Sequence, residues 1–382
     1  YTTNLIMEIE SKTKKLKIVI SANSSWYVYN FRKNTIIALK KLGHQVFIVA
    51  PRDEYSEDIT DLGVEYCEFN LEPRGINPFK EIAVIFSLLL IYSRIRPDFV
   101  MNFTPKMNIY GTISSALTGA KVVNNISGLG MAFTSDSIFS RFVSLLYRFT
   151  QIFAVKIFFQ NKNDMKLFVT RNIAPQIKCD YLPGSGVDLS RFSVVCAQDD
   201  GVVRFVIVCR MLYQKGVGLF VKAAEHFKEK YGNSVEFRAI GFLDDNNPGA
   251  ISKEVMDEWV EKDFLIYQGA LKDVRPEIAI SDCIVLPSVY PEGTPKSLLE
   301  AAAMGKPIIT TNMPGCSSTV DDGINGYLCR PNSLDDLILN LDKLIDMGHK
   351  ARCDMGLKSR KLVERNFDEK IVIQKYLDCL SL

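Results

Sequence analysis

Short apolar runs of strand length alternate with helical segments along this chain, and this alternation limits the possible folds more than any other feature. A helical segment at residues 30–43 connects the first two runs, and Gly43 supplies its stop signal. The runs of the first half lie at residues 16–21, 45–50, 98–103, 121–126, 155–160 and 177–182. Because strands that alternate with helices form a parallel sheet with crossover connections, we predict an α/β fold.

The alternation stops once and then starts again, which indicates two domains. A polar stretch from Pro183 to Gly201 interrupts it. The later segments are apolar runs at residues 203–208, 235–241, 282–288 and 307–311, with a helical segment at 217–230. A length of 382 residues also favours two domains. We predict Rossmann-like domains at residues 14–185 and 186–365, and a C-terminal helix at 366–382 that packs back on the first.

The composition is ordinary for a soluble globular protein, with 47% hydrophobic and 24% charged residues. No apolar run approaches the ~18 residues that a membrane span needs. The N-terminus has no signal-peptide core, and we expect the residues before about Lys14 to form a leader without fixed structure. The nine cysteines are scattered, with no C-x-x-C pair and no His/Cys cluster of zinc spacing, so we expect reduced, mostly buried thiols in the cytosol.

Charge is distributed unevenly between the two halves. Residues 1–182 carry 22 Lys and Arg against 15 Asp and Glu, a net +7, while the rest of the chain is net −5. A basic half is expected to meet something anionic, such as a lipid surface or a phosphorylated substrate. We expect no nucleic-acid partner, because no basic stripe or recognition motif accompanies the charge.

The stretch "YPEGTPKSLLEAAAMGKPIITTNMPG" (290–315) places two carboxylates around a predicted helix start. Thr294 is the predicted N-cap and Pro295 the first helical residue. Glu292 would lie in the loop at the carboxyl end of a strand, where α/β sheets bind ligands. Glu300 would lie within the apolar helix, where a buried carboxylate needs hydrogen-bond donors such as sugar or ribose hydroxyls. The alternative is that Glu300 faces water.

The stretch "VCRMLYQKGVG" (208–218) places two cations next to a helix start. Arg210 follows a predicted strand, Lys215 precedes the helix, and glycines at 216 and 218 allow close approach of a ligand. These features favour a diphosphate site. The spacing matches neither a Walker loop nor G-x-G-x-x-G. A surface Arg and Lys on a connection are the alternative.

Together these segments resemble the retaining glycosyltransferases of the GT-B fold, specifically family four. The resemblance also rests on "PGC" (314–316), "DGINGYL" (322–328) and "GSGVD" (184–188). Residues 25–55 further resemble bacterial members that build O-antigen, capsule or glycoprotein glycans on undecaprenyl diphosphate. The resemblance implies two Rossmann-like parallel-sheet domains facing across a cleft.

The resemblance also implies roles on the donor side. Arg210 and Lys215 would hold the donor diphosphate and stabilise the leaving group. Glu300 would bind the ribose hydroxyls. The other implied contacts are Glu292, Gly293 and Thr294 with the donor sugar, and Leu271 with the base. Catalysis would then be electrostatic, with retention and without a protein nucleophile. We expect no cofactor and no metal, because the sequence has no Asp-x-Asp pair and the two cations can replace magnesium.

Acceptor recognition is expected from the first half. Many relatives have a histidine beside the donor sugar, but His44, His226 and His349 do not follow the relevant strands. The residues of "NISGLGMAF" (125–133), namely Ser127, Gly128, Leu129 and Gly130, would approach the sugar instead. Of these residues, Gly128 is a predicted donor contact and Ser127 a predicted acceptor contact. The other acceptor candidates are Tyr27, Asn30, Arg32 and Lys106, with packing or solvation as the alternative.

The expected partners are a UDP-sugar, with an N-acetylhexosamine favoured, and a polyprenyl-diphosphate-linked saccharide acceptor. Residues 140–159 carry Arg141, Arg148 and Lys156 among aromatic residues and no acid. They indicate either peripheral contact with the cytoplasmic membrane face or a core helix leading into a strand.

Three other classes of protein share parts of this pattern. A nicotinamide oxidoreductase needs a Gly-rich turn after the first strand, and residues 21–31 contain no glycine. A sugar-nucleotide 2-epimerase would share the fold and the donor. If the chain were a non-catalytic, two-domain sugar-binding protein, we would expect an export signal and no affinity for nucleotides.

Overall fold

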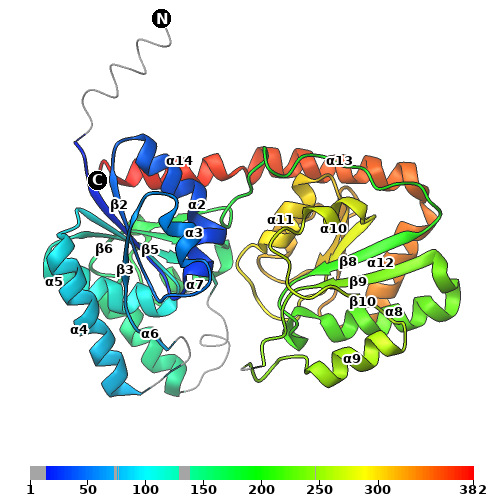
Figure 1. Ribbon diagram of the computed structural model, residues 1–382, viewed down its shortest axis with the longest axis horizontal. Helices are drawn as coiled ribbons and strands as arrows, with labels where there is room; N and C mark the ends of the chain where they lie inside the picture. Colours follow the sequence, from blue (N-terminus) through cyan, green and yellow to red (C-terminus); the bar gives the residue numbers. More distant parts are fainter. Residues whose placement is uncertain (1–13, 73–74, 76, 129–137, 246) are drawn as a thin grey trace, which may run out of the picture. The chain divides into compact units, whose positions relative to one another are not determined.

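The computed structural model describes residues 14–72, 75, 77–128, 138–245 and 247–382 (Figure 1). The chain divides into two compact units. The first ends at Ser185 and also takes in Val372–Leu382, and the second is Gly186–Ile371. Each unit contains one sheet, and all strand pairs within both sheets are parallel. The predicted α/β class with parallel sheets is therefore confirmed. The expected leader lies outside the described residues.

The first unit is built on a seven-stranded sheet with the order β3-β2-β1-β4-β5-β6-β7. Its strands are β1 (Lys17–Ser21), β2 (Gln45–Ala50), β3 (Glu65–Glu68), β4 (Phe99–Phe103), β5 (Lys121–Ile126), β6 (Ala154–Phe159) and β7 (Cys179–Tyr181). Its helices are α2 (Ser25–Lys41), α3 (Ser56–Thr60), α4 (Pro78–Ile95), α5 (Thr112–Thr118), α6 (Ile138–Thr150) and α7 (Lys162–Thr170), with short turns η1 (Met107–Gly111) and η3 (Gln176–Lys178). Each of the six predicted runs is a strand. The sequence missed β3, a polar edge strand without an apolar run.

The two faces of this sheet are covered by different helices. Val28, Ile36 and Leu39 of α2 pack on one face together with the C-terminal helix α14 (Glu369–Cys379). Helices α4 and α6 cover the opposite face, through Leu88 and Tyr92 of α4 and Tyr147 of α6. The strands are therefore buried on both sides, which explains their continuous apolar sequences.

Helix α14 is an integral part of the first unit although it comes last in the chain. Val372, Tyr376 and Cys379 are buried among the strands of this unit. The Tyr376 hydroxyl donates a 2.6 Å hydrogen bond to Oδ1 of Asn125 at the end of β5. The last helix thus supplies both apolar surface and a buried hydrogen bond.

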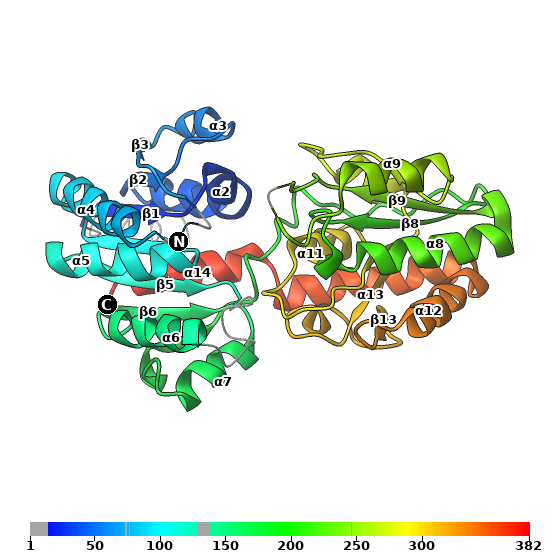
Figure 2. The same cartoon turned by 90° about the horizontal axis from the view of Figure 1, so that it is seen from below.

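The second unit is built on a six-stranded sheet with the order β10-β9-β8-β11-β12-β13. Its strands are β8 (Val203–Val208), β9 (Val235–Ile240), β10 (Ile266–Tyr267), β11 (Cys283–Leu286), β12 (Ile308–Thr311) and β13 (Gly326–Cys329). Its helices are α8 (Val217–Tyr231), α9 (Lys253–Glu261), α10 (Arg275–Ile280), α11 (Lys296–Ala303), α12 (Leu334–Asp346) and α13 (Gly348–Asn366), with turns η4 (Tyr213–Lys215), η5 (Gly232–Ser234) and η6 (Ser317–Thr319). Helices α8 and α12 lie side by side (Figure 2), and Lys230 of α8 pairs with Asp342 of α12 at 2.8 Å.

Helix α11 begins one residue later than predicted. Thr294 is not its N-cap, because Pro295 holds that position with an extended backbone (φ −64°, ψ 121°). The Pro295 carbonyl accepts the first helical hydrogen bond, from Leu299. A residue before proline is held in an extended conformation, so Thr294 stays in the loop.

Two of the nine cysteines depart from the expected reduced thiols. Cys196 and Cys353 form a disulfide, although they are 157 positions apart in the sequence, and their Cα atoms are 5.9 Å apart. The other seven are free, and four of them are buried. The spacing of the cysteines in the sequence does not predict a disulfide between two positions so far apart. Among the described helices, none is long and apolar enough to cross a membrane.

Candidate active site

The predicted donor-side residues gather at one edge of the second sheet. Strands β8, β11 and β12 are parallel neighbours, so their carboxyl ends share that edge. Arg210 follows β8, Glu292 follows β11, and Gly315 follows β12. Leu271 follows β10 at the same edge, and its side chain is exposed. The topology thus brings together residues that are up to 105 positions apart.

A buried ion pair joins Lys215 and Glu292 at this edge. Their side chains are only 13% and 9% exposed. Burial alone would lower the pKa of Lys215, but the Glu292 carboxylate and Tyr290 raise it above its ordinary value. The Lys215 ammonium also lies 5.4 Å from the centre of the Tyr290 ring. Lys215 is therefore held charged at neutral pH.

The loop that carries Lys215 requires a glycine at its junction with α8. Gly216 has φ +79°, and a Cβ at this position would lie 2.0 Å from the Pro287 carbonyl oxygen. A side chain would force the loop away from β11, and Lys215 away from Glu292.

Arg210 is the more exposed cation of the two. Its side chain is 39% exposed, and Nη1 lies 3.3 Å from Oδ2 of Asp244, which is mostly buried. Sequence reasoning missed Asp244, although it follows β9 at the same edge of the sheet. This carboxylate orients the guanidinium and leaves other N–H groups for a ligand.

Glu300 on α11 is mostly buried, with 14% of its side chain exposed, so it does not face water as the alternative required. Burial raises the pKa of its carboxyl, while Lys296 and Arg191 oppose the rise. The Lys296 ammonium is 3.9 Å away. Sequence reasoning missed both cations. A ligand hydroxyl at this carboxylate would supply the hydrogen bond that a buried anion needs.

The backbone around Gly293 packs against the loop after β12. The Glu292 N–H donates to the Pro314 carbonyl at 3.1 Å, and Thr294 is buried. Gly315 has φ +85°, and a Cβ there would lie 1.9 Å from the Gly293 carbonyl oxygen. This contact explains the "PG" in the sequence, because only glycine permits it.

In the first unit, Arg32 is not a surface cation. It is 1% exposed and its guanidinium carbon lies 4.3 Å from the centre of the Phe103 ring. Nη2 donates to the Tyr27 hydroxyl at 3.1 Å, while Nε and Nη1 have no hydrogen-bond partner among the described residues. The aromatic rings and the Tyr27 hydroxyl enclose the Arg32 side chain on the buried face of α2, so a diphosphate does not reach it without movement. Asn30 donates to the Trp26 carbonyl at 2.9 Å.

Lys106 is also already bound, in contrast to the expectation of a cation open to an acceptor. Its ammonium lies 2.6 Å from Oε1 of Glu81 and donates to the Glu72 and Gly75 carbonyls at 2.8 Å. Both side chains of the pair are mostly buried. A buried carboxylate neutralises this cation, and sequence spacing could not reveal a partner 25 residues away.

A strained residue that the sequence analysis missed lies at the same end of the first sheet. Thr104 follows β4, is buried, and has φ +82°. A β-branched residue rarely adopts this conformation, and such strain is concentrated at functional sites. Ser127 and Gly128 follow the neighbouring strand β5, whereas Leu129 and Gly130 lie outside the described residues. The carboxyl edge of β4 and β5 thus carries Ser127, a predicted acceptor contact, and Gly128, a predicted donor contact.

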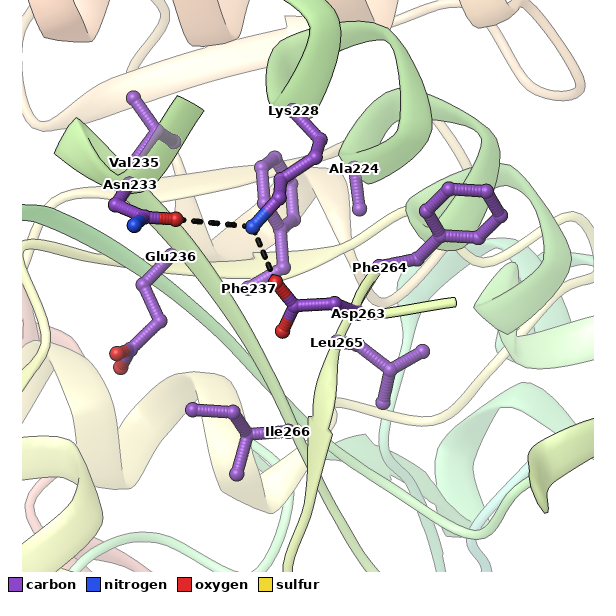
Figure 3. Close-up of a pocket in the computed structure, with 10 residues that line it drawn as sticks. All are labelled: Ala224, Lys228, Asn233, Val235, Glu236, Phe237, Asp263, Phe264, Leu265 and Ile266. Atoms are coloured by element: carbon purple, nitrogen blue, oxygen red, sulfur yellow. Dashed lines mark hydrogen bonds and ion pairs between the residues drawn. The ribbon is translucent and has the colours of Figure 1, made fainter. Parts of the chain in front are cut away.

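A separate hollow lies at the opposite, amino end of β9 (Figure 3). Lys228 there is bound by Asp263 and by Oδ1 of Asn233 at 3.0 Å. The residues that line the hollow include none of the predicted site residues. The hollow is therefore not part of the candidate active site.

Both units match models of glycosyltransferase families. Residues 17–161 match "Glycosyl transferase 4-like", and residues 203–347 match "Glycosyl transferases group 1". With its two parallel-sheet units, this chain is a GT-B glycosyltransferase. The first unit matches the 4-like family and the second unit the group 1 family, which confirms the family resemblance.

Two relatives match over most of the chain. The N,N'-diacetylbacillosaminyl-diphospho-undecaprenol alpha-1,3-N-acetylgalactosaminyltransferase of Campylobacter jejuni is 27% identical, and the match covers 95% of this chain and 97% of that protein. The UDP-Gal:alpha-D-GlcNAc-diphosphoundecaprenol alpha-1,3-galactosyltransferase of Escherichia coli is 27% identical, over 72% of this chain and 73% of that protein.

A solved structure shares the fold. Anabaena Alr3699/HepE in complex with UDP and glucose superposes with a TM-score of 0.78 at 15% identity, over 96% of this chain and 99% of that one.

Proposed function

We propose that this enzyme transfers a sugar from a UDP-sugar, with an N-acetylhexosamine favoured, to a polyprenyl-diphosphate-linked saccharide in bacterial surface glycan assembly. The observation that carries the proposal is the buried Lys215–Glu292 pair beside Arg210 at the carboxyl edge of the second sheet. The Campylobacter jejuni relative supports the choice of substrates, because its name specifies an N-acetylgalactosamine transfer to a diphospho-undecaprenol acceptor.

The two cations suit the leaving group of this reaction. Breaking the sugar–phosphate bond leaves negative charge on the nucleoside diphosphate, and fixed positive groups stabilise that charge without reorganisation. An ammonium has three donors, so Lys215 can bind a phosphate oxygen while Glu292 keeps it charged and in place. Arg210 is open enough to add a bidentate contact.

The remaining carboxylate would position the nucleotide. Glu300 is buried and close to Lys296, so ribose hydroxyls could donate to it without the cost of removing bulk water. The acceptor hydroxyl would attack from the face that the diphosphate leaves, and a phosphate oxygen would take its proton. This course retains the anomeric configuration and needs no nucleophile from the protein.

Contact with a membrane surface is supported by two helices of the first unit. Helix α4 exposes large apolar side chains at helical spacing, namely Phe79, Ile82, Phe86 and Leu90. Helix α6 exposes Phe142, Leu145 and Phe149 beside the exposed Arg141 and Arg148. Exposed apolar side chains flanked by arginine are typical of a helix lying in a membrane interface. We place this contact at the cytoplasmic face.

A donor panel tests the proposal. UDP-linked N-acetylhexosamines, UDP-galactose and GDP-mannose are each incubated with the enzyme and a lipid-diphosphate-linked saccharide, and the product is analysed by NMR. We expect an α-linked product from an α-linked UDP donor. Release of an epimer from donor alone would favour the 2-epimerase, and a product of inverted configuration would contradict retention.

Metal independence is tested in the same assay. Activity is expected to persist in EDTA, because Arg210 and Lys215 supply the charge that magnesium would otherwise supply. Loss of activity in chelator that magnesium or manganese restores would overturn this part of the proposal.

A further inference from the structure

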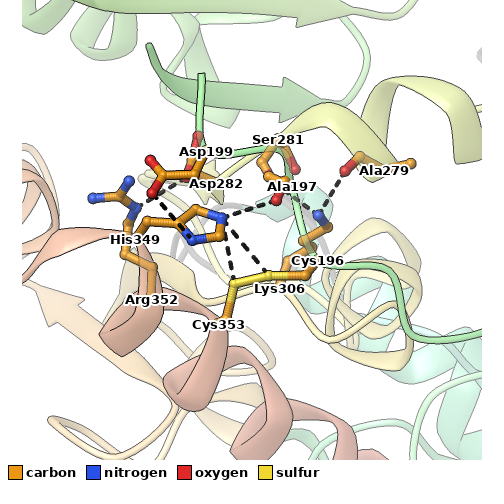
Figure 4. The surroundings of a disulfide bond; sticks show 10 residues. All are labelled: Cys196, Ala197, Asp199, Ala279, Ser281, Asp282, Lys306, His349, Arg352 and Cys353. Carbon is orange, nitrogen blue, oxygen red and sulfur yellow. Dashed lines mark hydrogen bonds and ion pairs between the residues drawn. A yellow bond between two sulfur atoms is a disulfide. The ribbon is translucent and has the colours of Figure 1, made fainter. Parts of the chain in front are cut away.

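Two cysteines and a histidine meet in the second unit, away from the residues assigned to the donor. His349 and Cys353 lie one turn apart on α13, and Cys196 lies in the segment that leads to β8. Nε2 of His349 is 3.8 Å from Sγ of Cys196 and 3.7 Å from Sγ of Cys353 (Figure 4). The transfer reaction gives this cluster no role.

We propose that, in the reduced chain, Cys196, His349 and Cys353 bind a Zn²⁺ ion. Two thiolates and one imidazole are a common zinc ligand set, and residues i and i+4 of a helix present their side chains on one face. A tetrahedral zinc site with ordinary bond lengths separates sulfur from nitrogen by about 3.6 Å. The two measured distances, 3.8 and 3.7 Å, are close to this value.

The orientation of His349 also fits a metal ligand. While Nε2 faces the two sulfur atoms, Nδ1 lies 4.0 Å from Oδ2 of Asp199. Zinc-binding histidines usually donate their second N–H to a carboxylate, which fixes the ring and its tautomer. Nε2 also lies 2.8 Å from the Ala197 carbonyl oxygen, and zinc binding requires that this contact be given up.

Neighbouring cations are directed away from the cluster. Nε of Arg352 donates to Oδ1 of Asp282 at 2.9 Å, and the Lys306 ammonium donates to the Ala279 and Ser281 carbonyls (Figure 4). Cys196 is exposed and the other two ligands are partly buried. A metal ion can therefore reach the cluster from solvent. The fourth position is left for water.

Zinc and the disulfide exclude each other. A dithiol reductant gives two electrons and two protons to the Cys196–Cys353 bond, which yields two thiols and leaves the reductant as a disulfide. Zn²⁺ then replaces the two thiol protons, which are released to solvent. The sulfur atoms move apart to about 3.8 Å, the separation in a tetrahedral site.

Metal analysis of the full-length protein tests this proposal. The protein is purified with a dithiol reductant, loaded with Zn²⁺ or Co²⁺, and desalted. We expect about one zinc per chain, and a sulfur-to-cobalt charge-transfer absorption in the cobalt form. His349→Ala and Cys353→Ser should each weaken zinc binding by about 100-fold or more, and Asp199→Asn by about tenfold. The matched controls Cys67→Ser and His226→Ala should bind zinc as the wild type does.

A reduced and folded protein that binds no zinc would overturn the proposal, as would equal zinc loss in the controls. A disulfide that persists in reductant and excludes metal would do the same. If Cys353→Ser fails to fold, His349→Ala decides the matter, because it keeps both sulfur atoms. A disulfide without a metal role predicts that His349→Ala changes neither zinc content nor thiol count.

Discussion

The carboxyl edges of the two sheets use different chemistry. The edge of the second sheet is charged, with Arg210, the Lys215–Glu292 pair and Glu300 all close to it. The edge of the first sheet carries hydroxyls and amides, and its cations Arg32 and Lys106 are already bound inside the unit. Under the proposed function, the second edge would meet the anionic diphosphate, while the first would recognise neutral hydroxyls with little electrostatic bias.

The largest expected effect concerns the charged edge. Lys215→Ala should lower turnover by about 100-fold or more, because it removes a fixed charge beside the leaving group and leaves Glu292 buried without its cation. Steady-state kinetics with a UDP-sugar would measure this. Lys222→Ala, which removes an exposed lysine from the following helix, is the matched control. Near-normal turnover in Lys215→Ala would remove the contrast between the two edges.

Glu300→Gln should separate binding from stability. We expect UDP affinity to fall by about 10- to 100-fold, the effect of losing hydrogen bonds to a charged group. Because burial raises the pKa of Glu300, the folded state holds its proton more tightly than the unfolded state, and stability falls as pH rises above the ordinary glutamate range. The variant should therefore have a higher melting temperature than the wild type at pH 7.

Titration calorimetry with UDP measures the affinity, and thermal melts at pH 5 and pH 7 measure the stability. The stability gain should be smaller at pH 5, where the wild-type carboxyl is closer to protonated. Unchanged UDP affinity together with lower stability would mean that Glu300 only supports the fold.

The first unit should account for lipid binding. Sedimentation with anionic liposomes is expected at low salt and should weaken as salt screens the charges. Replacing Arg141 and Arg148 with glutamate should reduce it by about 30-fold or more, since each basic residue contributes about 1 kcal/mol near an anionic surface. Lys253→Glu with Lys262→Glu, on an exposed helix of the second unit, is the control. Binding that ignores salt and both pairs of substitutions would contradict this assignment.

The smallest effect concerns the uncharged edge. Thr104→Asn should raise the free energy of unfolding by about 1 kcal/mol, because asparagine tolerates the positive φ that strains threonine. If the strain serves recognition, the KM for the acceptor should rise while the KM for the donor is unchanged. An equal change in both values would indicate general damage to the fold.

Most strands could be predicted from the sequence because their residues are buried on both faces and read as continuous apolar runs. The short strands β3, β10 and β13 are only partly buried, and they were not predicted. Arg210, Lys215 and Glu292 could be selected because they are charged residues in the loops that follow predicted strands, and Glu300 because it is a carboxylate within an apolar helix. Their partners Asp244, Lys296 and Arg191 could not be selected from the sequence, because only the folded structure brings each of them next to a site residue.

The site residues of the first unit were harder to predict from the sequence for the same physical reason. Burial of Arg32 under aromatic rings depends on Tyr376, which is 344 positions further along the chain. The Lys106–Glu81 pair and the Cys196–Cys353 bond also join distant segments. No local pattern encodes these contacts, so the acceptor side remained a set of candidates while the donor side formed a motif.

The position of α14 has a consequence for biosynthesis. The second unit is one continuous segment, Gly186–Ile371, whereas the first needs Val372–Leu382 to fill its core. On the ribosome, the second unit can therefore complete its core before the first does, although it is made later. Until Tyr376 emerges, the first unit exposes an apolar groove over its central strands, and this nascent intermediate is the form most open to chaperones and proteases.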